Sequence, residues 1–139
     1  METKFNFNSQ VCTSRSQSER LLALGLKKET ADMSIICKYV GCDDDGVLIY
    51  EENIYPFPPS NERISPAWSL HRLIEMMPKN IAIDGDTAYP LQIQKRSDGK
   101  WCVGYQGWYD CVGDLYDSVI WIYQLLISEG YLDEFCNKG

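Results

Sequence analysis

The residues that could carry nucleophilic chemistry in this sequence are one histidine and six cysteines. A cysteine nucleophile needs a neighbouring imidazole to take its proton, so any such site would have to use His71, the only histidine. His71 falls at the edge of the apolar stripe of a predicted helix, and no cysteine stands in a known local catalytic motif. We therefore predict no catalytic residue and keep a small cysteine-dependent enzyme using His71 as an alternative. The cysteines are Cys12, Cys37, Cys42, Cys102, Cys111 and Cys136.

Metal coordination has little support from the spacing of these side chains. Zinc sites usually pair cysteines a few residues apart, whereas four residues separate Cys37 from Cys42 and eight separate Cys102 from Cys111. Residues 43–46 (DDDG) resemble part of a calcium-binding loop, but they lead directly into an apolar strand. The chain also has no glycine-rich phosphate loop and no serine-hydrolase motif. We predict neither a metal nor a cofactor.

Aromatic side chains outside the predicted core are the strongest indication of a binding surface. Tryptophan, tyrosine and arginine are enriched among the residues that carry binding energy at protein interfaces. Trp68 is predicted on the polar side of a helix, next to Arg72, and the others fall in predicted loops. The predicted binding residues are Tyr55, Phe57, Trp68, Arg72, Trp108 and Tyr109. Packing of the same aromatics onto the body of the protein is the alternative interpretation.

The charge balance indicates which partners to expect. The 139 residues contain 13 Lys and Arg against 20 Asp and Glu, for a net charge of −7. Because a negatively charged protein is poorly suited to bind phosphates, we predict no direct nucleic-acid binding. Residues 101–139 alone carry six acids against one lysine. If these acids formed one surface stripe, the chain would be an acidic mimic of nucleic acid that blocks a DNA- or RNA-binding enzyme, which is a second alternative.

The hydrophobic pattern predicts neither a membrane segment nor an export signal. No segment has the roughly 18 consecutive apolar residues of a membrane span, and the first residues lack the apolar core of a signal peptide. We therefore expect no membrane association and a cytoplasmic location. In that compartment the cysteines are expected to be free thiols.

Capping signals and hydrophobic periodicity predict the helices that would position these residues. Ser14 with Gln17 has the form of a capping box, which opens a helix over residues 14–25. A serine N-cap followed by a proline predicts a second helix at residues 66–77. The third helix is predicted at residues 114–129, where an aspartate precedes the apolar run and a glycine follows it.

Alternating apolar segments between the helices predict strands. Residues 33–40 and 47–51 form a predicted hairpin, followed by a long Pro-rich loop over residues 52–65. Further strands are predicted at residues 81–84, 89–95 and 101–105. A short loop ending in glycine between the last two strands would place Val103 opposite Ile93.

The order α-β-β-α-β-β-β-α favours the α+β fold class. We predict a single globular domain over residues 1–139, with an antiparallel sheet of about four to five strands, in two hairpins, packed with three helices. The last helix is apolar almost all round, so it is expected either to lie centrally or to be covered by a second subunit in a homodimer. Residues 131–139 form a predicted C-terminal tail that folds back.

Several short motifs are spread over most of the chain: Cys12-Thr13, Gln17-Ser18, Leu21-Leu22, Gly25-Leu26, residues 30–33, residues 66–70 with Leu73, Trp121 and residues 130–132. Together they resemble a family of short uncharacterised proteins encoded by phages and mobile elements of gut bacteria. The stretch Pro-Ala-Trp-Ser-Leu at residues 66–70 is the most specific of them.

The resemblance implies no activity, cofactor or catalytic residue. It implies a mobile-element context, in which small acidic proteins often act by binding a host or rival protein. We therefore expect a non-enzymatic protein-binding module, an inhibitor or accessory factor, in the cytoplasm of a bacterial host cell.

Overall fold

The computed structural model describes residues 9–82, 85 and 87–137. Within them the chain is α+β, with three α-helices and three small antiparallel sheets of three, two and three strands. The helices are α1 (Arg15–Ala23), α2 (Leu70–Met76) and α3 (Leu115–Ser128). The strands are β1 (Met33–Cys42), β2 (Leu48–Tyr55), β3 (Ser65–Ala67), β4 (Asn80–Ile81), β5 (Tyr89–Pro90), β6 (Gln92–Lys95), β7 (Trp101–Tyr105) and β8 (Trp108–Gly113). Short 3-10 turns span Lys28–Thr30 and Asp133–Phe135.

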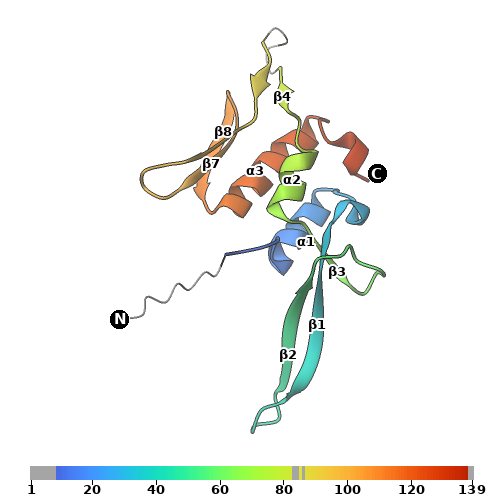
Figure 1. The fold of residues 1–139 in the computed structure, drawn as a ribbon. Helices are drawn as coiled ribbons and strands as arrows, with labels where there is room; N and C mark the ends of the chain where they lie inside the picture. The colour runs from blue at the N-terminus through green and yellow to red at the C-terminus, as the bar shows by residue number, and fades with distance from the viewer. Residues whose placement is uncertain (1–8, 83–84, 86, 138–139) are drawn as a thin grey trace.

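The prediction of one sheet of four to five strands is wrong in its finer detail. The first hairpin belongs to a sheet of order β2-β1-β3, and the second to a sheet of order β6-β7-β8. Figure 1 shows why the two hairpins do not join: β1 and β2 extend away from the helices, whereas β7 and β8 lie beside α3 on the body of the protein. The α+β class itself is confirmed.

Helix α1 forms as its capping box predicts. The Ser14 hydroxyl accepts a hydrogen bond from the Gln17 backbone N–H at 3.2 Å, and the Gln17 side-chain oxygen accepts one from the Ser14 N–H at 3.0 Å. The chain leaves the helix through Gly25, whose φ of +106° suits a residue without Cβ. Leu21 of α1 is fully buried.

Helix α2 begins later than predicted, because residues 65–67 form the strand β3 instead of the first helical turn. Pro66 lies opposite Ser34 of β1, and an edge strand tolerates a proline because its outer side needs no donor. The N-cap is Ser69, whose hydroxyl accepts from the Arg72 N–H at 3.1 Å. Asp32 fixes this serine by accepting from its N–H at 2.9 Å and its hydroxyl at 2.6 Å.

The two predicted hairpins form, with differences at their ends. Strand β2 continues to Tyr55, so the predicted loop over residues 52–65 is wrong for its first residues, which pair with β1. In the second hairpin Val103 lies opposite Ile93 as predicted. The predicted strand over residues 89–95 is interrupted at Leu91. Of the predicted strand over residues 81–84, residues 83–84 lie outside the described residues.

Strand β8 was not predicted, and it brings two cysteines together. It pairs with β7, and the disulfide Cys102–Cys111 joins the two strands with 4.1 Å between the Cα atoms. The prediction that all cysteines are free is therefore wrong for this pair. Residues nine apart in sequence become neighbours because the intervening turn reverses the chain. The free cysteines are Cys12, Cys37, Cys42 and Cys136.

Helix α3 is the centre of the core. Its residues Val119, Ile122 and Leu126 are fully buried, and the hydroxyl of its Tyr123 donates to the Leu73 carbonyl of α2. Strands β7 and β8 and helix α1 pack around α3, so a single chain already provides the central position that its apolar surface requires. The homodimer through this helix stays a prediction.

The C-terminal segment folds back, as predicted for the part of it that is described. Leu132 is buried, and the Lys27 N–H donates to the Phe135 carbonyl at 2.8 Å. A β-bridge also joins Leu26 to Cys136. Among the described helices, none is both long and apolar enough to cross a bilayer.

Candidate functional site

The structure places Trp68 in the core, so the prediction that it is exposed is wrong. Its side chain is fully buried, and its indole N–H donates to the Thr30 hydroxyl at 2.9 Å. Its backbone N–H donates to the Thr13 hydroxyl at 3.0 Å. The helical wheel misplaced Trp68 because this residue precedes α2 and follows the geometry of β3. Trp68 therefore holds the N-terminal segment and the turn before β1 against α2.

Three other predicted binding residues lie on the body of the protein. The Arg72 guanidinium donates to the Thr30 carbonyl at 2.8 Å and lies 2.6 Å from the Glu75 carboxylate. Trp108 of β8 packs against the hydrophobic core that includes the buried residues of α3. Tyr109 is 38% exposed, and its hydroxyl donates to Gln94 at 2.9 Å. These three are held by intramolecular contacts.

The remaining two, Tyr55 and Phe57, belong to a large exposed apolar surface on the β1–β2 hairpin. We call residues 33–55 the arm, which Figure 1 shows as the long extension below the helices. Soluble monomers rarely expose apolar patches of more than a few hundred square ångströms. Large apolar residues that are 40–65% exposed on the arm or directly after it are Tyr39, Val40, Val47, Leu48, Ile49, Tyr50, Ile54, Tyr55 and Phe57.

The register of the arm gathers many of these side chains on one face. Tyr39 lies opposite Tyr50 and Ile35 opposite Ile54, and residues directly opposite each other in an antiparallel pair share a face. The Tyr39 and Tyr50 rings meet edge to face, with 5.8 Å between their centroids. A β-bulge between Tyr39 and Gly41 shifts the pairing register by one residue. Cys42 therefore lies opposite Leu48 on this same face. We call it the apolar face of the arm.

The arm also has unpaired strand edges. In the order β2-β1-β3, β2 is an edge strand over its whole length. Strand β3 pairs with Met33, Ser34 and Ile35 only, so the rest of β1 has a partner on one side. Edge strands are commonly protected by charged side chains, proline or short length; β2 has eight residues and no proline, and its only charged side chains are Glu51 and Glu52.

A cavity of about 290 Å³ lies at the base of the arm, between the apolar face and the N-terminal segment. Ile35 and Ile54 line it from the arm, and Val11 and Cys12 line it from the segment. Burial raises the pKa of the Cys12 thiol, and the nearby Asp32 carboxylate raises it further. A thiol with a raised pKa is a weak nucleophile at neutral pH, so Cys12 contributes an apolar wall.

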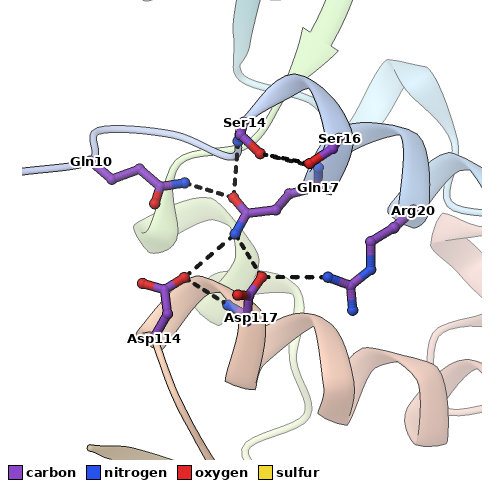
Figure 2. Close-up of polar contacts among 7 residues, drawn as sticks. All are labelled: Gln10, Ser14, Ser16, Gln17, Arg20, Asp114 and Asp117. Atoms are coloured by element: carbon purple, nitrogen blue, oxygen red, sulfur yellow. Dashed lines mark hydrogen bonds and ion pairs between the residues drawn. The ribbon is translucent and has the colours of Figure 1, made fainter.

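A polar network anchors the N-terminal side of this cavity to the core (Figure 2). The Gln17 side-chain oxygen accepts from Gln10 at 2.7 Å, and its amide nitrogen donates to Asp117 at 2.8 Å and to Asp114 at 3.4 Å. Arg20 approaches Asp117 at 3.4 Å. Asp114 is itself the N-cap of α3. One glutamine thus connects the N-termini of two helices with the segment that lines the cavity.

A cysteine–histidine enzyme would need a cysteine side chain paired with His71, and no such pair is found among the described residues. The His71 side chain is 89% exposed, and its Nε2 atom lies 3.5 Å from the Glu75 carboxylate. Burial and the nearby Asp133 raise the pKa of the Cys136 thiol. Cys37 lies on the arm, on a different element from His71. Within the described residues, no group of three or more His, Cys, Asp and Glu side chains is arranged to hold a metal ion.

Five of the six acidic residues of the C-terminal third have described side chains, and these five divide between the two ends of α3. Asp114 and Asp117 lie at its N-terminus, whereas Glu129, Asp133 and Glu134 follow its C-terminus. A helix of 14 residues is about 20 Å long. These carboxylates therefore form two groups and not one continuous stripe along the helix.

Comparison of the chain with protein-family models, with curated protein sequences and with solved structures finds no match.

Proposed function

We propose that this chain is a non-enzymatic protein-binding module that contacts its partner through the arm, and that it serves a phage or mobile element as an inhibitor or accessory factor. The observation that carries the proposal is the combination, on one projecting hairpin, of exposed aromatic and aliphatic side chains with an unpaired strand edge. Aromatic anchors surrounded by smaller apolar residues are typical of the energetic centre of a protein interface.

The size of the exposed surface supports this interpretation. An aromatic side chain buries about 150–250 Å² when it is covered. Tyr39 and Tyr50 on the apolar face, Tyr55 on the other face and Phe57 just after the arm are 40–65% exposed, so the four rings offer roughly 400 Å² over both faces together, to which the aliphatic residues add. A standard interface buries about 800 Å² on each partner. The arm is thus of the right order to form most of such an interface.

The mobile-element context belongs to the same proposal and rests on the resemblance of residues 66–70 and the other motifs. The bacterial cytoplasm is part of it too but has less support, because a disulfide such as Cys102–Cys111 is rare in that compartment. The two alternatives have less support. The described carboxylates of the C-terminal third fall into two groups at the ends of α3, and His71 is solvent-exposed on α2.

Site-specific photo-cross-linking in the native host tests the proposal. A photoreactive phenylalanine analogue replaces Tyr50 on the arm, and a matched variant carries it at Tyr131, which is exposed on the body. We expect a discrete covalent adduct with one host or rival protein from position 50, and its loss when Leu48→Asp is added. Equal adducts from both positions, or none from position 50, would contradict the proposal.

A further inference from the structure

We propose that the partner adds an extended strand to the free edge of β2, and that this strand carries basic residues at its centre and apolar residues on both sides of them. The inference rests on the proposed function and specifies the chemistry of the partner. Its basis is the pattern of charge along the edge strand and the rest of the arm.

The arm is the most acidic part of the first half of the chain. Residues 33–55 contain one lysine, Lys38, against five acids, so the arm contributes −4 to a net charge of −7. The acids are Asp43, Asp44, Asp45, Glu51 and Glu52. The first three form the turn at the tip, where Asp43 accepts from the Asp45 and Val47 N–H groups. Glu51 and Glu52 lie at the middle of β2.

The two glutamates point to opposite faces of the arm. Successive side chains alternate along a strand, so Glu52 shares the apolar face with Tyr50 and Ile54, while Glu51 lies on the other face opposite Lys38. Glu52 is half exposed, and Arg15 lies 3.8 Å from it. An exposed pair of this kind contributes little and leaves the carboxylate available.

An incoming strand must satisfy both the apolar and the acidic positions. Next to Leu48, Tyr50, Ile54 and Tyr55 it needs apolar side chains, which gain cross-strand packing. At its centre it needs two neighbouring basic residues, one for each face. Main-chain hydrogen bonds to the edge would supply affinity, and the side-chain pairs would supply selectivity.

A second copy of this chain fits the edge poorly. In a symmetric antiparallel pairing of two full β2 strands, Glu51 of one copy comes opposite Glu52 of the other. Like charges directly opposite each other destabilise a strand pair, and this pairing would contain two such contacts. The acidic arm is therefore better suited to a different, basic chain.

Titration with blocked synthetic peptides of the length of β2 tests the inference. The basic probe has two central lysines flanked by alternating valine and threonine, and the acidic probe has two glutamates in their place. We expect wild-type protein to bind the basic probe roughly tenfold more tightly. Hydrogen exchange should slow in β2 and remain unchanged in β6 and β7.

Charge reversal on the arm supplies the decisive comparison. Glu51→Lys with Glu52→Lys should reverse the preference toward the acidic probe, whereas Glu129→Lys with Glu134→Lys, an equal change of charge on exposed positions at the C-terminal end of α3, should leave it unaltered. The wild-type titration alone remains a test if the arm variant folds poorly.

Different negative results of the peptide titration would contradict different proposals. Equal affinity for both probes, with protection of β2, would overturn the basic preference and leave the arm as a binding site. No protection of β2 by either probe would overturn strand addition, and the cross-linking result at position 50 would then decide the proposed function independently.

Discussion

Truncation of Trp68 is expected to cost a large part of the stability of this protein. The side chain is fully buried and its indole N–H is bonded to Thr30. Replacement of a buried tryptophan by alanine usually costs about 3–5 kcal/mol, because the lost burial adds to the cavity left behind. Domains are stable by only about 5–15 kcal/mol. For a chain of this size, a loss of that magnitude lowers the melting temperature by about 8–16 °C.

Two further variants separate the contribution of the indole hydrogen bond from that of burial and supply an exposed control. Trp68→Phe keeps most of the buried ring and removes the indole donor, so it should cost about 1–2 kcal/mol. Phe57→Ala, at a residue that is 65% exposed, should change stability by no more than about 0.5 kcal/mol. Unfolding in urea, followed by far-ultraviolet circular dichroism, measures all three. A loss of less than about 1 kcal/mol for Trp68→Ala would refute the assignment of this residue to the core.

Three further outcomes are expected. Denatured, unreduced protein should have four titratable thiols and reduced protein six; six before reduction would contradict the Cys102–Cys111 disulfide. Burial raises the pKa of Tyr123 far above its ordinary value of about 10, so its contribution to stability is present below that pH and is lost as the pH rises above it. Ionisation of Tyr123, the last part of the tyrosinate absorbance change, should therefore coincide with alkaline unfolding, and ionisation of all nine tyrosines in an intact fold would contradict this. Gln17→Glu should lower the unfolding free energy by about 1–2 kcal/mol at neutral pH because it places a carboxylate beside Asp117; unchanged stability in urea would show that the network of Figure 2 contributes little.

Local signals in the sequence were sufficient for the elements that depend on local chemistry. The capping box of Ser14 and Gln17, the N-cap Asp114 and the glycine after α3 all lie within a few residues of the boundary that they define. The register of β6 and β7 follows from the short loop between them, whose Gly99 has a φ of +86°.

The elements that were missed depend on contacts between distant segments. Ser65 and Pro66 have the form of a helix start, but pairing with β1 makes them a strand. Trp68 is buried because Thr13 and Thr30, both far away in sequence, supply its hydrogen-bond partners. Strand β8 forms by pairing with β7, and its own residues gave no alternating pattern to predict it.

The arm could have been anticipated in part. Residues 47–50 are four consecutive apolar residues directly after an acidic turn, and a strand that is apolar on both faces is expected to be covered on both. The structure leaves them exposed, which no pattern in one sequence reveals, because exposure depends on where the rest of the chain packs.

The connection between α1 and α3 affects the order in which this protein acquires its structure during synthesis. Gln17 meets Asp117 across 100 residues of sequence, and the Gly25 carbonyl accepts from the Asn137 N–H at 2.7 Å. Leu21 and Leu26, both fully buried in the finished fold, therefore leave the ribosome long before the residues that cover them. Contacts of such separation form slowly because a long loop must close first. We conclude that helix α1 docks only after α3 has been made, so a nascent chain that stops before α3 would present these leucines to chaperones and proteases.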